Sequence, residues 1–550
     1  MSNAALYLHP NGYDTTGQAL LGRHSAGESF LRGFLRHADV ERFYFWNVAG
    51  RPQAELEALV DRIESPGKPV TWIPQLRRDE LATPGVLNVP SPEIDAEAWQ
   101  RMPQGARRYA LCGLTHTTAT ATVMRLIPDL LIAPVEDYDA LICTSSAVRD
   151  AVETQLGAMR DYMSDAYGPR RRPEPMRATI PLGVNVDDFT TSPEHRKAWR
   201  ERLDIPQDAV VVLFVGRFSV RTKMNPALMA MALERAARRT GQDIYWVNSG
   251  WIEPASAAAE FHENTRRLCP SVHYREVDGR PADVRFSIWS VADLFISFSD
   301  NIQETFGLTP VEAMAAGLPC VVTDWNGYKD TVRDGVDGFR VPTTAPRAGF
   351  GTDLAYWFAN RWMSYENYVG ATAQYTAVDL ERAETMLATL IQQPQLRASM
   401  GASARQRARE VFDWRAIVPQ YQALWAEQHA RLHAAPPEPE RRANPYRPDP
   451  YALFAGYPTR HLSRRDLVAL NPGLDWPAAR ARLEGPLAVY SRFNRPSDAE
   501  LEIVVNALAE HGPMPVAKVI ELIPPGRRNY LERGLLWLAR HDIIALQPGG

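Results

Sequence analysis

Two glutamates lie eight residues apart in the segment 300–319, which reads DNIQETFGLTPVEAMAAGLP. The segment is expected to run from the end of a strand into the start of a helix. Free backbone N–H groups and the helix dipole at such a place suit a phosphate. A carboxylate beside it, Glu304 or Glu312, would accept hydrogen bonds from neighbouring hydroxyl groups. The same spacing has a structural interpretation, because Thr309 to Glu312 also reads as a capping box.

A second segment, VVLFVGRFSVRTKMNP at 211–226, carries two cations. Gly216 and Arg217 stand at the end of an apolar run, and Lys223 follows six residues after Arg217, before the next expected helix. Two cations at the mouth of a cleft would neutralise a diphosphate. The alternative is that both are ordinary surface residues, since the chain has 61 lysines and arginines.

The elements that must position these residues are short apolar runs alternating with longer amphipathic stretches. Such alternation predicts parallel sheets wound on both faces by helices. We expect two series of strands, joined by a polar linker near 185–206. The first series is 5–9, 42–47, 69–73, 109–114, 140–144 and 178–182. The second is 209–215, 243–248, 272–276, 293–297, 320–323 and 338–341. Ligands bind such sheets outside the carboxyl ends of the strands.

The two motif segments together resemble the C-terminal half of the retaining nucleotide-sugar glycosyltransferases with two Rossmann-like domains (fold B, family 4, also called group 1). The shared pattern is a strand ending in Gly-Arg with a lysine soon after, followed by Glu-x-Phe-Gly-x4-Glu-Ala-Met-Ala-x-Gly-x-Pro. The resemblance is strong over residues 178–434, diffuse over 1–177 and absent over 435–550. In many relatives the lysine comes five residues after the arginine, whereas here it comes six, and we choose Lys223 over Arg221.

The resemblance implies a role for each residue in the second half. Glu312 would bind the ribose hydroxyls of the nucleotide, and Glu304 would contact the hydroxyls of the donor sugar. Arg217 and Lys223, beside Gly216, would hold the diphosphate. Backbone amides would come from three residues: Phe306, Gly307 and Leu308.

The resemblance also points to residues in the first half. A glycine-bearing loop lies against the donor diphosphate in the family, and Gly22 with Arg23 is the choice here. Ser25 with Glu28 gives this stretch an alternative reading as a loop and N-cap. His116, after the strand at 109–114, corresponds to a histidine at the cleft. A lone histidine at a strand end also fits a structural role.

The rest of the chain divides at changes in composition. We expect an acceptor-side domain at 1–185, a nucleotide-sugar domain at 186–412 and a crossover helix with an aromatic stripe at 413–434. A proline-rich linker at 435–450 leads to a small, mainly helical domain at 451–550 that resembles a winged-helix module. This last part has 12 basic and 10 acidic residues. Such a balance favours self-association or acceptor docking over DNA binding.

The composition of the chain excludes several classes of protein. The 550 residues carry a net charge of −4, four scattered cysteines and no long apolar segment. These features exclude a zinc ribbon and a disulfide framework, and they predict a cytoplasmic protein without an integral membrane segment. Asp137 and Asp139 form an Asp-x-Asp that we interpret as a solvated strand start. No cluster has metal-ligand spacing, so no metal and no cofactor is expected.

The expected function is a metal-independent retaining glycosyltransferase acting on a nucleotide diphosphate sugar. The acceptor is undetermined: a glycan, protein, lipid, metabolite or nucleic acid. Two alternatives stay open. One is a sugar-nucleotide epimerase on the same architecture. A phosphorylase shares that architecture too, but it would need a lysine for pyridoxal phosphate, and the sequence has no motif for one. The other is a binding or scaffold protein acting through 451–550.

Overall fold

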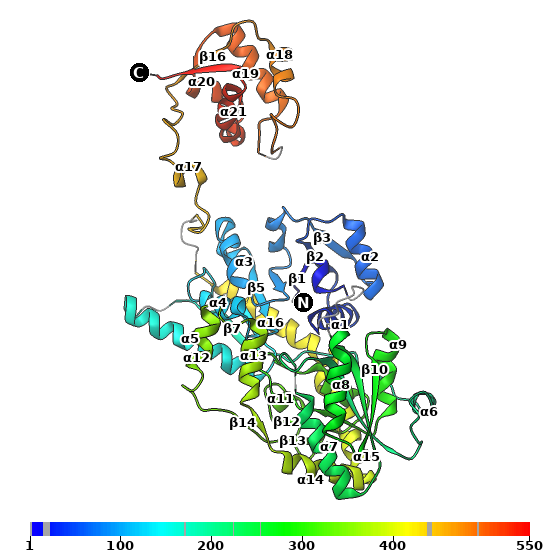
Figure 1. Ribbon diagram of the computed structural model, residues 1–550. Helices are drawn as coiled ribbons and strands as arrows, with labels where there is room; N and C mark the ends of the chain where they lie inside the picture. Colours follow the sequence, from blue (N-terminus) through cyan, green and yellow to red (C-terminus); the bar gives the residue numbers. More distant parts are fainter. Residues whose placement is uncertain are drawn as a thin grey trace. The chain divides into compact units, whose positions relative to one another are not determined.

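The computed structural model describes residues 3–14, 22–169, 172–223, 225–252, 255–436, 443–491 and 494–549. It forms two compact units, residues 1–444 and 445–550, shown in Figure 1. The first unit contains two α/β domains, each built on a parallel sheet. The second is a small, mainly helical domain with three short strands. None of the helices described is long and apolar enough to cross a membrane.

The first sheet has seven strands in the order β3-β2-β1-β4-β5-β6-β7, all parallel. Its strands are β1 Ala5–Leu8, β2 Phe43–Asn47, β3 Val70–Ile73, β4 Val86–Val89, β5 Ala110–Leu114, β6 Ala140–Cys143 and β7 Met176–Thr179. Its helices are α1 Gly22–His37, α2 Gln53–Ile63, α3 Ile94–Arg101, α4 Ala121–Asp129 and α5 Ser146–Tyr167.

Two strands of this sheet correct the sequence analysis. The sequence did not predict β4, because a four-residue run between Gly85 and Pro90 reads as a turn; its residues are nevertheless all buried. The strand expected at 178–182 is β7, which begins two residues earlier. From Ile180 the chain leaves the sheet and continues to Val184, which bridges to Asp413.

The second sheet has six strands in the order β10-β9-β8-β11-β12-β13, also parallel. The strands are β8 Val210–Phe218, β9 Ile244–Ile252, β10 Val272–Asp278, β11 Leu294–Ser297, β12 Cys320–Thr323 and β13 Gly338–Val341. The helices are α6 Pro193–Arg202, α7 Pro226–Thr240, α8 Ala258–Arg267, α9 Ala282–Ser287, α10 Leu308–Ala315, α11 Tyr328–Thr331, α14 Leu380–Gln392 and α15 Pro394–Arg407. The central strands are continuous apolar runs because helices cover both faces of a parallel sheet.

A hairpin of two helices interrupts the second domain after β13. Strands β14 Thr343–Thr344 and β15 Ala377–Val378 pair antiparallel at its base. Between them lie α12 Thr352–Ala359 and α13 Tyr365–Gln374, yellow-green in Figure 1. The sequence analysis did not predict these helices, because the segment lacks an apolar period of 3.6 residues and is rich in glycine, threonine and aromatic residues.

A last long helix, α16 Trp414–Ala434, returns to the first domain. The Trp414 indole donates a hydrogen bond to Ser29 Oγ at 2.8 Å. Trp425 contacts Phe34 edge to face at 5.7 Å between ring centroids. Gln428 donates to the carbonyl of Leu111 at 2.8 Å. The aromatic stripe of this helix is therefore core, which is the interpretation that its spacing favours.

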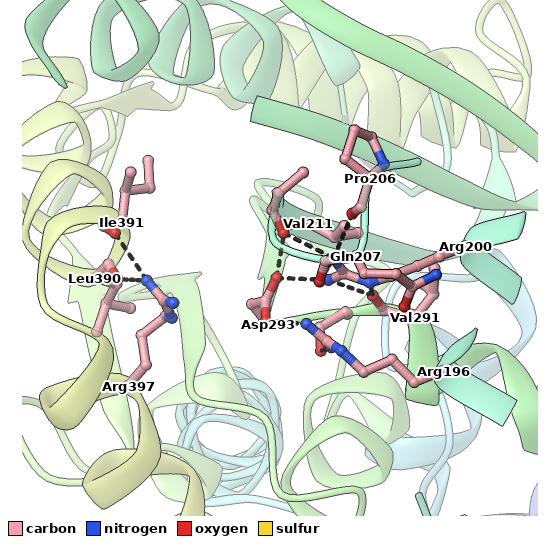
Figure 2. A network of polar contacts seen from close by, with 12 residues as sticks. Arg196, Arg200, Pro206, Gln207, Val211, Val291, Asp293, Leu390, Ile391 and Arg397 are labelled. Carbon is pink, nitrogen blue, oxygen red and sulfur yellow. Dashed lines mark hydrogen bonds and ion pairs between the residues drawn. The ribbon is translucent and has the colours of Figure 1, made fainter. Parts of the chain in front are cut away.

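An ion-pair network at the amino ends of β11 and β12 fastens α6 to the second sheet (Figure 2). The Arg200 guanidinium is fully buried and binds the Asp293 carboxylate at 2.9 Å, and Arg196 binds the other oxygen at 2.8 Å. A cavity of about 450 Å³ lies beside it, with Arg397 on its wall. Arg397 donates to the carbonyls of Leu390 and Ile391. Since each arginine is bonded within the protein, we interpret this region as structural.

The second unit combines three antiparallel strands in the order β17-β16-β18 with short helices. The elements are α17 Pro450–Leu453, β16 Leu467–Leu470, α18 Trp476–Arg482, α19 Asp498–His511, β17 Met514–Pro515, α20 Val516–Glu521, α21 Arg528–Arg540 and β18 Ile544–Gln547. The mainly helical character that the sequence analysis expected for 451–550 is confirmed. Strand β16 comes from the amino side of the unit and pairs with both β17 and β18.

Candidate active site

The strand order of the second sheet reverses between β8 and β11, which lie next to each other. In doubly wound sheets the ligand crevice opens outside the carboxyl ends at such a switch point. Strand β8 ends at Phe218 and β11 ends at Ser297. The two segments that the sequence singled out, 216–223 and 300–312, leave from these two strand ends. The topology thus brings to one place residues about eighty positions apart in the chain.

A lysine and a glutamate meet at this point. Lys223 Nζ lies 3.6 Å from Glu304 Oε2, and both side chains are partly buried. Arg217 donates from Nη2 to Thr222 Oγ1 at 3.2 Å, which holds its guanidinium beside the same loop. The Arg221 backbone carbonyl accepts a hydrogen bond from Asn301 at 2.6 Å. This bond ties the cationic loop to the glutamate loop.

Gly307 forms the junction between the glutamate loop and helix α10. Its φ of +86° is in the left-handed region, and a Cβ there would lie 2.1 Å from the Tyr328 ring. The helix begins at Leu308 with Gly307 as N-cap. The capping-box interpretation of Thr309 and Glu312 is therefore wrong, because Thr309 already lies inside the helix. Gly307 offers no side-chain cap to the first turn of α10, and the amide N–H groups at such a helix start suit a ligand in place of a cap.

Phe306 contributes to the site through its backbone alone. Its side chain is 1% exposed and packs against Phe412, with 5.9 Å between ring centroids. A Cβ on Gly327 would lie 2.4 Å from the Phe306 Cα. The segment after β12 therefore presses directly on the glutamate loop and fixes its backbone.

Glu312 lies in the second turn of α10 and is partly buried. Its carboxylate makes no hydrogen bond to the residues that the structure describes. Burial raises the pKa of Glu312 to about 7, while the Arg285 charge acts in the opposite direction. An unpaired, desolvated carboxylate gains free energy when it accepts hydrogen bonds. Glu312 is thus poised to bind hydroxyl donors.

Asp300 is a buried carboxyl that the sequence analysis did not select. It is 4% exposed, and its Oδ1 has no partner within the described ranges. Burial raises the pKa of Asp300 to about 7. The sequence signal that could have identified Asp300 is an aspartate three positions after the end of the short strand Leu294–Ser297.

Three glycines from adjacent strand ends form a side-chain-free floor beside the switch point. Gly216 of β8 pairs with Gly250 of β9, and Gly279 follows β10. A Cβ on Gly250 would lie 1.9 Å from the carbonyl oxygen of Gly216. The sequence analysis selected Gly216 alone. The other two could have been found from glycines at the ends of neighbouring strands.

The site residues expected in the first domain are His116, Gly22 and Arg23. His116 follows β5 and is partly buried, and its neighbour Thr117 lies beside the Tyr365 hydroxyl of α13. Gly22 and Arg23 open helix α1, so Ser25 lies inside that helix and its capping-box interpretation is wrong. The side chain of Arg23 and the loop before it fall outside the described residues.

The two domains touch just beyond Glu304. Ser145 Oγ donates to the Thr305 carbonyl at 2.7 Å. Ser146, the first residue of α5, donates from its backbone N and its Oγ to the Asp330 carboxylate at 2.6 and 2.7 Å. The amino end of α5 therefore rests on the glutamate loop. The described residues contain no group of three or more His, Cys, Asp and Glu side chains arranged to hold a metal ion.

Residues 195–367 match the profile of the family described as glycosyl transferases group 1. A D-inositol 3-phosphate glycosyltransferase of Geodermatophilus obscurus is 32% identical over 196 residues, which cover 33% of this chain and 40% of the relative. That of Corynebacterium diphtheriae is 32% identical over 166 residues, covering 30% of this chain and 38% of the relative. The chain thus spans less than half the length of these relatives.

Solved structures align over more of the chain with lower identity. Anabaena HepE in complex with UDP-glucose aligns with a TM-score of 0.48 and 16% identity, covering 78% of this chain and 99% of its own. Sucrose-phosphate synthase of Thermosynechococcus elongatus aligns with a TM-score of 0.47 and 16% identity, covering 78% of this chain and 100% of its own.

Proposed function

We propose, from the match of residues 195–367 to the family of glycosyl transferases group 1, that the chain transfers a sugar from a nucleoside diphosphate sugar to an acceptor hydroxyl. We propose further that the transfer retains the anomeric configuration and needs no metal ion. The second domain binds the donor, and the first domain presents the acceptor across the cleft.

The observation that carries the proposal is the meeting of opposite charges at the switch point of the second sheet. Lys223 and Glu304 are 3.6 Å apart beside the uncapped start of α10. The unpaired Glu312 carboxylate lies one turn further along the same helix. A nucleoside diphosphate sugar fits this arrangement: its diphosphate would lie next to the cations, its sugar next to Glu304 and its ribose next to Glu312.

Each residue has a distinct task in the proposed reaction. The bond between the anomeric carbon and the diphosphate oxygen breaks, and the acceptor oxygen forms a new bond on the same face of the sugar. The acceptor proton passes to the departing diphosphate. Arg217, Lys223 and the first amides of α10 offset the negative charge that develops on the leaving group. Glu304 orients the donor sugar by binding its hydroxyl groups.

A thermal-shift screen with UDP, GDP, ADP, dTDP and their common sugars tests the proposal. Ligand at about 100 times its dissociation constant adds roughly 2.7 kcal/mol of stability. We expect one nucleotide to stabilise the wild type and Lys197→Ala, an exposed control on α6, to the same extent, and to stabilise Lys223→Ala clearly less. If no nucleotide stabilises the wild type, the donor site is refuted.

Product analysis with the donor alone separates transfer from epimerisation. An epimerase would convert the donor to a second nucleotide sugar without an acceptor. A transferase would leave the donor intact or release the free sugar slowly by hydrolysis. The matched relatives are named for an inositol phosphate acceptor, and that compound is one acceptor to include in the assay.

A further inference from the structure

The hairpin of residues 345–376, which holds α12 and α13, places aromatic side chains in solvent. Helix α12 has no buried residue. Trp362 is 71% exposed and Trp357 is 41% exposed, and they are the most exposed tryptophans in the described part of the chain. Phe350, Tyr356 and Tyr375 are also more than half exposed. An exposed apolar patch of this kind marks an interaction site.

The hairpin is rigidly built although its outer face is open. Phe358 of α12 stacks on Tyr368 of α13 with 4.3 Å between centroids and 4° between planes. Tyr356 meets Trp362 edge to face at 5.6 Å. The aromatic rings are therefore held in place before any partner arrives, which lowers the entropy cost of binding.

The inner helix of the hairpin is fastened to the candidate active site. The Tyr365 hydroxyl donates to Gln303 Oε1 at 3.1 Å, one residue before Glu304. Asn301 donates to the Val369 carbonyl at 3.3 Å. Thr117, next to His116, lies within hydrogen-bonding reach of the same Tyr365 hydroxyl. The hairpin thus reaches the cleft where both domains meet.

The exposed rings continue outward from that contact. Trp362 precedes Tyr365 by three residues, which limits their Cα atoms to about 11 Å apart. The exposed aromatic residues therefore begin within about 11 Å of Tyr365, which reaches the site, and the contact of Trp362 with Tyr356 continues them onto α12. A long acceptor whose end lies in the cleft would pass over this face.

The side chains exposed on the hairpin of residues 345–376 indicate which kind of ligand it would bind. Its exposed large apolar side chains are all aromatic, and four of the five carry an N–H or O–H group. The hairpin contains two arginines, one aspartate and one glutamate, so it has no net charge. Helices that bind membrane surfaces usually combine an apolar face with lysine and arginine. Ring faces attract positively polarised C–H groups, and their polar tips hydrogen-bond hydroxyl groups.

We propose that residues 345–376 form a carbohydrate-binding platform that holds a glycan acceptor during transfer. This inference rests on the proposed function, since it names the acceptor class for the same site. Sugar rings stack their C–H faces on Trp357 and Trp362, and Tyr365 couples the platform to the loop of Glu304. Specificity for an acceptor of several sugar units follows from the length of the face.

Direct binding without any donor tests the platform. The probes are methyl glycosides and linear oligosaccharides of glucose, galactose, mannose and N-acetylglucosamine, followed by saturation-transfer NMR on the full chain. We expect one series to bind with affinity that rises with chain length. Trp362→Ala should weaken it about 3- to 10-fold, the worth of one aromatic contact, and Trp362→Phe should largely restore it. Tyr162→Ala, an exposed aromatic on α5, serves as the matched control.

Several results would overturn the platform. One is that no oligosaccharide binds a protein that is stabilised by a nucleotide. Another is Trp362-dependent sedimentation with phosphatidylglycerol vesicles, which would assign the face to a membrane. A third is a wild-type dimer that Trp362→Ala dissociates, which would assign it to a second copy. Nucleotide stabilisation is measured on every variant, so a failure of the donor site is recognised separately.

Discussion

Replacing Glu312 by glutamine should make the free protein more stable and the donor complex weaker. The structure holds this carboxylate in α10 without a hydrogen bond to the described residues, and burial raises its pKa from 4.5 to about 7. A carboxylate whose pKa is raised destabilises the folded state when it is charged. Glutamine has nearly the same shape and no charge, so Glu312→Gln removes this cost.

The magnitude and its pH window follow from the two pKa values. The rise from 4.5 to about 7 corresponds to about 3 kcal/mol at 1.36 kcal/mol per pKa unit. Part of the side chain reaches solvent, so we expect about 1–2 kcal/mol after screening. The unfolded chain releases its proton near 4.5 and the folded chain only near 7. The wild type therefore loses stability relative to Glu312→Gln as pH rises through this window, and the difference is constant above it.

Urea denaturation of both proteins at about pH 4 and about pH 8 measures the effect. The advantage of Glu312→Gln should be near zero at the lower pH and about 1–2 kcal/mol at the higher. Asp300 titrates in the same window but is present in both proteins, so its contribution cancels. Nucleotide affinity should fall about 10- to 100-fold, because charge-assisted hydrogen bonds to the ribose are lost. An equal stability difference at both pH values, or unchanged nucleotide affinity, would refute this reasoning.

Three further predictions concern separate parts of the chain. Glu304→Ala should reduce sugar transfer by at least about 100-fold while nucleotide stabilisation persists; equal loss of both would show a folding defect instead. Lys223→Ala should weaken nucleoside diphosphate binding about 10- to 100-fold by calorimetry, and Lys197→Ala should not; similar effects would remove the diphosphate role. In the second unit, Arg527 binds Glu500 at 2.8 Å and holds the pKa of Glu500 at about 2. The stability from this depressed pKa is present above about 4.5 and is lost as pH falls toward 2. Arg527→Ala should therefore destabilise the full chain at neutral pH and have little effect near pH 2 in urea denaturation; a pH-independent loss of stability would contradict the linkage.

The sequence predicted the parts of the fold whose local signals are strong. The apolar runs at 209–215 and 320–323 are strands because branched and aromatic residues fill both faces of a buried parallel sheet. The amphipathic stretch at 413–433 is a helix because its apolar residues recur with the period of 3.6 residues that places them on one face of a helix. Most of the predicted strands were confirmed, with boundaries that differ by a few residues.

The failures have physical causes as well. Strand β4 is four residues long between a glycine and a proline, so its backbone pairing with β1 and β5 forms it rather than its own propensity. Helix α12 exposes its aromatic face, so it lacks the apolar stripe by which a helix is recognised. Both capping boxes were wrong because α10 begins at Leu308 and α1 at Gly22, each upstream of the threonine or serine that was expected to cap it.

The sequence by itself determined which residue types could bind a sugar nucleotide and that each follows a strand. It determined the Glu304 and Glu312 spacing, the cations after β8 and the family that these motifs resemble. Only the tertiary structure decided that Lys223 lies against Glu304, because strand order, and not chain order, makes β8 and β11 neighbours. Only burial decided that Glu312 is a desolvated carboxylate with a raised pKa. Desolvation and long-range pairing are sums over residues distant in the chain, and a local motif does not contain them.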